Sequence, residues 1–119
     1  MSHIVTIKTQ AKDPQAITAA CQRLGFAAPV QGTAKLFEGE ATGLLVRLPG
    51  WLYPLVIDTT TGDIRYDNYS GQWGDPQHLN RFKQAYAIEK TRIEAARKGH
   101  RLTEQPQPDG SVKLTITTR

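Results

Sequence analysis

The alternation of apolar and polar residues predicts strands at the start and in the middle of the chain. In the opening stretch "SHIVTIKT", Val5 and Ile7 share one side of an extended segment and polar residues occupy the other. The stretch "GLLVRLPGWLYPLVIDTTTGDIRYD" breaks into short apolar runs that are separated by turn-forming residues. We expect three antiparallel strands over residues 44–48, 53–58 and 64–67, after one irregular strand around 35–38.

A first amphipathic helix is predicted over residues 14–24. Asp13 precedes Pro14, and this pair is typical of a helix start, because Asp caps free N–H groups and Pro lacks the N–H that a first turn leaves unpaired. Gly25 follows as the residue that ends the helix. One apolar face recurs at helical spacing and contains Ile17, Ala20, Cys21 and Leu24.

A second, longer helix is predicted over residues 76–98. Asp75 and Pro76 repeat the same helix start, and Gly99 provides the second helix end. At 1.5 Å per residue, this helix would be about 34 Å long. Its expected apolar face contains Leu79, Phe82, Tyr86, Ile93 and Ala96.

The end of the chain has the pattern of a β-hairpin. A short strand near residues 100–105 is followed by a turn with Asp109-Gly110 at its tip, and then by a strand that points Val112, Leu114 and Ile116 to one side. The predicted order is therefore β-α-β(3–4)-α-β-β. We expect a single α+β domain over residues 1–119, with an antiparallel sheet of about five to six strands and two helices on one face.

Composition places the chain among ordinary globular proteins. It has 119 residues, of which 22% are charged and 39% hydrophobic, and this is enough chain for one core. Cys21 is the only cysteine, so no internal disulfide is possible and a reducing compartment is expected. The opening residues lack the apolar core of a signal peptide, and no apolar run is long enough to span a bilayer. We therefore expect a cytoplasmic protein without a membrane anchor.

Charge is unevenly distributed along the chain. The net charge is +4, but residues 81–101 alone carry +5. Just upstream, four acidic residues surround Arg65 and give residues 58–75 a charge of −3: Asp58, Asp63, Asp67 and Asp75. The sequence therefore predicts an acidic region that leads into a basic helix.

Several motifs resemble a known family of unknown function. The stretch "MSHIVTIKT", Asp13, "LGF" at 24–26, "YA" at 86–87 and "DGSVKL" at 109–114 resemble the family called hypothetical chloroplast reading frame thirty-five, which occurs in plastids and cyanobacteria. The central stretches "TGDIRYDNYSGQWG" and "FKQAYAIEKTRIEAARKGH" are similar to its bacterial branch. The resemblance implies a small soluble protein that is encoded beside AAA-type ATPases and another small protein. It thus implies an accessory role.

The sequence contains no arrangement of residues that is typical of catalysis. Cys21 has the spacing of a core residue, and the three histidines, His3, His78 and His100, lack the spacing of metal ligands. The acidic residues Asp58, Asp63 and Asp67 do not follow a calcium-loop pattern, and we interpret them as solvated carboxylates of a hairpin. We therefore predict no catalytic residue, no cofactor, no metal site and no enzyme activity.

Tyr69, Trp73 and Glu89 are the candidate partner-binding residues. Tyrosine and tryptophan often anchor interfaces, and Tyr69 and Trp73 can equally cover the end of the core. Glu89 falls within the apolar face of the second helix, where an unpaired carboxylate would be costly. It can pair with Arg92 or Arg65, or it can mark a polar spot where a partner docks.

The second helix also carries a basic stripe of residues seven positions apart, Lys83, Lys90 and Arg97. Such a stripe can follow a phosphate backbone, although Glu94 partly neutralises it and a solvated helix face is the simpler interpretation. The leading hypothesis is a non-enzymatic accessory module that binds a protein partner through the open sheet surface or the sheet edge, together with Tyr69, Trp73 and this helix. The alternative is weak, non-specific nucleic-acid binding through the helix.

Overall fold

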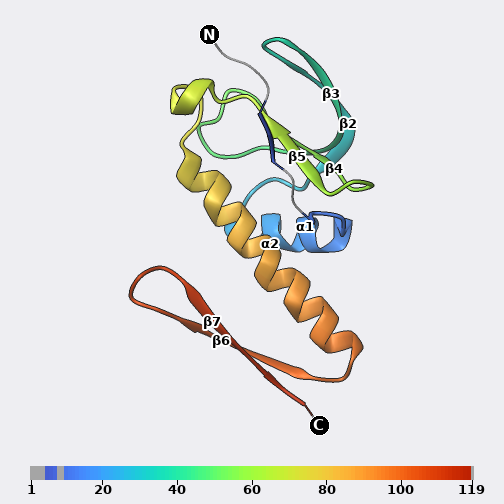
Figure 1. Cartoon of the computed structure of the whole chain (residues 1–119), viewed down its shortest axis with the longest axis vertical. Helices are drawn as coiled ribbons and strands as arrows, with labels where there is room; N and C mark the ends of the chain where they lie inside the picture. The colour runs from blue at the N-terminus through green and yellow to red at the C-terminus, as the bar shows by residue number, and fades with distance from the viewer. Residues whose placement is uncertain (1–4, 8–9, 119) are drawn as a thin grey trace.

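The computed structural model describes residues 5–7 and 10–118 and has the expected α+β fold (Figure 1). The order of the elements, β-α-β4-α-β-β, confirms the prediction. In chain order the elements are β1 (Val5–Ile7), α1 (Pro14–Leu24), β2 (Val30–Leu36), β3 (Gly39–Val46), β4 (Leu55–Asp58), β5 (Asp63–Tyr66), the 3-10 turn η1 (Tyr69–Gly71), α2 (Pro76–Arg97), β6 (Arg101–Pro106) and β7 (Val112–Thr117).

Five strands form one antiparallel sheet in the order β1-β5-β4-β3-β2. Its first face is covered by both helices, and the main core lies between them. The strands contribute Val46, Leu55, Ile57 and Ile64 to this core, and the helices contribute Ile17, Ala20, Cys21, Leu79, Phe82 and Ala85. Burial of this much apolar surface is the main force that holds the helices on the sheet.

The second face of the sheet is partly covered, so only part of the expected open sheet surface is present. Strands β2 and β3 pair along their whole length and bury a second apolar cluster of Ala34, Leu36, Ala41 and Val56. A Cβ atom at Gly43 would lie 2.5 Å from the carbonyl oxygen of Ile57, so glycine permits a close crossing of β3 over β4. The hairpin curves over this face in Figure 1. The irregular strand predicted at 35–38 is instead the end of β2 and a turn.

Both helices begin and end where the sequence predicts. Asp13 accepts the N–H groups of Gln15 and Ala16 at the start of α1, and Gly25 ends it with a φ of 74°. Asp75 accepts the N–H of Gln77 at the start of α2. Local capping chemistry therefore sets the helix boundaries.

The predicted apolar face of α2 is partly wrong. Its buried residues are Leu79, Phe82, Ala85, Ile88 and Ala95. Tyr86 and Ile93 are only partly buried, and Ala96 is exposed. The buried stripe is displaced because only the first half of α2 faces the sheet, whereas the second half meets α1 and β6.

Strands β6 and β7 do not join the main sheet, contrary to the expected continuous sheet. They pair only with each other and form a separate hairpin, called the C-terminal hairpin below. The molecule measures 52 × 32 × 23 Å, and Figure 1 shows this hairpin at one end of the long axis and the β2–β3 hairpin at the other. The long helix α2 connects the two ends.

Candidate functional site

The structure confirms that Cys21 is a core residue. Its side chain is fully buried between α1 and the sheet, and burial raises the pKa of the thiol to about 11. A thiol with this pKa stays protonated at neutral pH and is a poor nucleophile. His78 and His100 lie at the two ends of α2, and His3 lies outside the described residues. In residues 5–7 and 10–118, no three His, Cys, Asp or Glu side chains could hold a metal ion together.

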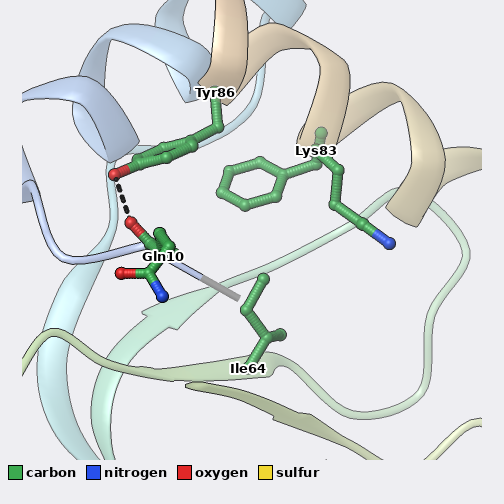
Figure 2. A pocket seen from close by; sticks show the side chains of 6 residues that line it. Gln10, Ile64, Lys83 and Tyr86 are labelled. Carbon is green, nitrogen blue, oxygen red and sulfur yellow. Dashed lines mark hydrogen bonds between the residues drawn. The ribbon is translucent and has the colours of Figure 1, made fainter. Parts of the chain in front are cut away.

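A small apolar cavity of about 160 Å³ lies between α2 and β5 (Figure 2). The described residues that line it include Ile64, Phe82 and Tyr86, and the basic residue Lys83 is at its rim and points away from Tyr86. The Tyr86 hydroxyl donates to the carbonyl oxygen of Gln10 at 3.1 Å and accepts the N–H of Asp13 at 3.3 Å. The hydroxyl therefore serves to join α2 to the start of α1.

Tyr69 and Trp73 belong to a cluster of four aromatic rings that we call the aromatic patch, formed by Phe37, Tyr53, Tyr69 and Trp73. The centroid of the Trp73 ring lies 4.8 Å from that of Tyr69, 5.3 Å from that of Phe37 and 5.8 Å from that of Tyr53. Trp73 is thus the central ring of the patch.

The aromatic patch reaches the solvent. Phe37 and the neighbouring Leu52 are each 57% exposed, and the other three rings are half-buried. The rings meet Trp73 at interplanar angles of 34°, 55° and 71°, so their faces point in different directions. The sequence pattern identified Tyr69 and Trp73 but missed Phe37 and Tyr53, since these come from the β2–β3 turn and the segment before β4.

Residues 67–74, called loop 67–74 below, hold Tyr69 and Trp73 in place. Tyr69 and Ser70 have φ values of 48° and 52°, a left-handed conformation that costs a residue with a side chain about 1–2 kcal/mol. The carbonyl oxygen of Asn68 accepts the N–H groups of Gly71 and Trp73, and its side-chain amide donates to the carbonyl oxygen of Gly74. The hydrogen bonds of Asn68 within the loop therefore stabilise its strained conformation.

The Trp51 side chain packs against the same loop. A Cβ atom at Gly74 would lie 2.3 Å from the Trp51 ring, so only glycine allows the ring to pack against the loop backbone. The Trp51 indole N–H donates to the carbonyl oxygen of Asp75 at 3.0 Å. The backbone N–H of Leu52 donates to the carbonyl oxygen of Trp73 at 2.9 Å. The contacts of Trp51 and Leu52 thus hold loop 67–74 against the segment before β4.

The four acidic residues of the 58–75 region have different environments. Asp58 accepts N–H groups of the following turn, which lowers the pKa of its carboxyl, and Asp75 caps α2. Asp63 is buried and lies in the same turn as Asp58. Asp67 is fully buried, and neither carboxylate oxygen has a hydrogen-bond partner in the part of the chain that the structure describes. The interpretation as solvated carboxylates is therefore wrong for Asp63 and Asp67.

Two of the three cations in the basic stripe are paired with carboxylates. The Lys90 ammonium lies 3.1 Å from Asp13 and 2.9 Å from Glu94. The guanidinium of Arg97 lies 3.3 Å from the same Glu94. Lys90 raises the stability of the ionised Glu94 and thereby lowers the pKa of this carboxyl. The expected partial neutralisation by Glu94 is confirmed, and Asp13 increases it.

Glu89 lies in an ion-pair cluster that joins α1, α2 and β6. It lies 3.6 Å from Arg92, the pairing expected one helical turn away, and 3.5 Å from Arg23 of α1. Glu104 of β6 pairs with both arginines. Glu89 therefore forms the expected ion pair with Arg92, and the alternative pairing with Arg65 is wrong. Its role as a partner-binding residue stays a prediction. Arg23 and Glu104 could not be predicted as members of this cluster, because their contacts join residues far apart in the chain.

Comparison of the chain with protein-family models, with curated proteins and with solved structures finds no match. The resemblance to the chloroplast reading-frame family therefore stays a prediction. None of the helices in the described ranges is both long enough and apolar enough to cross a membrane.

Proposed function

We propose that the protein is a non-enzymatic accessory module that binds a protein partner through the aromatic patch. The observation that carries this proposal is the position of Trp73 at the centre of three other rings on a solvent-facing surface. Aromatic residues dominate the binding energy of protein interfaces, because they bury a large area and lose little conformational entropy.

The construction of the patch supports this proposal. Phe37 and Leu52 expose more than half of their surface, although burial would stabilise the free protein. Loop 67–74 keeps two residues in a strained conformation in order to place Tyr69 and Trp73 side by side. Strain and exposed apolar surface at one place are typical of a surface that is used for binding.

The resemblance described above implies which partners are to be sought. It implies a neighbouring AAA-type ATPase and a second small protein, and we propose one of these as the partner. Binding of the accessory module to either of them would need no catalytic group on this chain.

The proposal is tested by affinity capture from an extract of the native organism. Immobilised wild-type protein is compared with Phe37→Ala and Trp73→Ala, and the captured proteins are identified by mass spectrometry. We expect each substitution to reduce capture of the partner at least tenfold, because central aromatic residues contribute more than about 1.4 kcal/mol to binding.

Ile116→Ala is the matched control. Ile116 is an apolar residue of the opposite end of the molecule and is 49% exposed, which is close to the value for Phe37. We expect it to capture the partner as well as the wild-type protein does. Failure of wild-type protein to retain any stable partner, or equal capture by all variants, would contradict the proposal.

Nucleic-acid binding through the basic stripe is the weaker alternative. Lys90 and Arg97 already contact Asp13 and Glu94, so a phosphate would have to compete with these carboxylates. Lys83 is the stripe residue for which the structure gives no carboxylate within salt-bridge distance among the described side chains. The same immobilised protein, washed over labelled RNA and DNA at low salt, tests this alternative directly.

A further inference from the structure

Asp67 is the unusual residue next to the aromatic patch. Its side chain is fully buried, and both carboxylate oxygens lack a hydrogen-bond partner among the residues that the structure describes. Burial of a carboxylate without a partner is strongly unfavourable, since the lost hydration is not replaced. Native proteins seldom keep such a group without a use for it.

Asp67 is close in sequence to two rings of the patch. It is joined to Asn68, whose carbonyl oxygen accepts the N–H of Trp73 at 2.9 Å, and it precedes Tyr69 by two residues. The surrounding 58–75 region carries a charge of −3 in a protein of net charge +4. Asp58 caps a turn and Asp75 caps a helix. The carboxylate oxygens of Asp67, in contrast, have no hydrogen-bond partner among the described residues.

Aromatic faces close to a carboxylate favour the binding of a cation. The π-electrons of tryptophan and tyrosine attract a positive group that lies on the ring, and a nearby carboxylate adds to that attraction. Arginine fits these rings better than lysine does, because its guanidinium is planar, stacks on aromatic faces and is weakly hydrated.

We propose that the aromatic patch binds an arginine side chain of the protein partner, with the guanidinium on Tyr69 and Trp73 and with Asp67 as its counter-ion. This inference rests on the proposed function, because it names the group of the partner that the patch recognises. Asp67 has no exposed surface, so it acts on the guanidinium through its charge and not through a direct hydrogen bond. A buried charge acts over a longer range than an exposed one, because the effective dielectric constant of a protein interior is lower than that of water.

The test is an NMR titration of the full-length ¹⁵N-labelled protein with Nα-acetyl-arginine amide. Nα-acetyl-citrulline amide is the matched probe, since it has the same shape and no charge. We expect the arginine probe to shift the backbone amides of residues 68–73 and the indole N–H of Trp73 in a saturable manner. The backbone amides of the C-terminal hairpin, which does not join the main sheet, provide an internal reference that does not shift.

Two substitutions separate the two parts of the site. Asp67→Asn removes the charge and is expected to weaken binding of the arginine probe five- to tenfold. Its melting temperature should be equal to or above that of the wild-type protein, because an unfavourable buried charge is lost. Trp73→Leu keeps an apolar side chain but removes the aromatic face, and it should abolish the shifts of residues 68–72. Asp109→Asn, in the distant hairpin turn, is the control and should bind like wild type.

Several outcomes would overturn the inference. Equal shifts with the citrulline and arginine probes would show that the charge of the probe does not matter. Unchanged binding of the arginine probe by Asp67→Asn would show that Asp67 is not the counter-ion. A large fall in the melting temperature of Asp67→Asn would show that Asp67 holds the loop together. Binding of choline without binding of the arginine probe would assign the patch to a small quaternary ammonium compound.

The inference can fail while the proposed function survives. If capture of the partner depends on Phe37 and Trp73 but not on Asp67, the patch binds a partner without recognising a cation. If capture is lost in none of the three variants, the proposed function itself fails.

Discussion

The two ends of the protein are built from similar strands but are held by different forces. At one end, the β2–β3 hairpin curves over the sheet and buries an apolar cluster, and Phe37 at its turn contacts Trp73. At the other end, the C-terminal hairpin has no sheet to join, and Ile116 remains 49% exposed. The second hairpin is instead attached through polar contacts, which include the ion pairs of Glu104 with Arg23 and Arg92 and a hydrogen bond from Gln84 to Gly110.

This difference shows that alternation of apolar and polar residues predicts a strand but not the partner of the strand. Val112, Leu114 and Ile116 alternate as regularly as the residues of the main sheet. An isolated two-stranded hairpin is at best marginally stable in water. We therefore expect the core to withstand salt, whereas the attachment of the C-terminal hairpin should depend on salt and on its ion pairs.

The largest expected effect concerns the core and its buried thiol. Cys21 has a pKa of about 11 in the folded protein, against 9.0 for an ordinary thiol, so the unfolded chain loses this proton first as the pH rises. The free energy of unfolding should therefore fall between about pH 9 and pH 11, by on the order of 2 kcal/mol, and should be unaffected by this group below pH 9.

Urea denaturation of the wild-type protein and of Cys21→Ala across this pH range measures the effect. The lysines and tyrosines titrate in both proteins, so the difference between the two curves isolates the thiol. The difference in the free energy of unfolding between the wild-type protein and Cys21→Ala should become smaller as the pH rises. A gap that stays constant up to pH 11 would mean that the thiol is not buried in solution.

A smaller effect is expected at the C-terminal hairpin. Glu104→Gln removes the carboxylate that pairs with two arginines, and exposed ion pairs contribute about 0.5–1 kcal/mol. Hydrogen exchange of the β6 and β7 amides should accelerate about two- to fivefold, with little change in the amides of the main sheet. High salt should have the same effect on the wild-type hairpin.

Glu94→Gln serves as the comparison for this variant, since Glu94 also pairs with two cations of α2 but contacts no residue of the hairpin in the described contacts. Faster exchange in the hairpin of Glu94→Gln, or faster exchange of the main sheet in Glu104→Gln, would show that the two regions are not held separately.

Features that depend on neighbouring residues could be predicted from the sequence. The caps of both helices, the core position of Cys21 and the pairing of Glu89 with Arg92 follow from spacing within a few residues. Tyr69 and Trp73 were recognised as candidates for the same reason, because they lie close together in one polar, glycine-containing stretch.

Features that depend on distant contacts could not be predicted. Asp67 resembles any solvated turn residue in the sequence, and its burial depends on the tertiary structure around it, which local spacing does not show. Phe37 and Tyr53 join the aromatic patch only when the chain folds back on itself. Residues 31–43 contain three glycines, and glycine is depleted in strands, so this hairpin left little trace in the sequence.

Hydrogen exchange of the wild-type protein, free and bound to the partner that it captures, tests the central claim most directly. It compares the two ends of the molecule in one experiment. If the aromatic patch is the docking surface, the partner will slow exchange of the amides in loop 67–74 and at the β2–β3 turn and will leave those of β6 and β7 unchanged. Slower exchange in β6 and β7, with loop 67–74 unaffected, would contradict the claim.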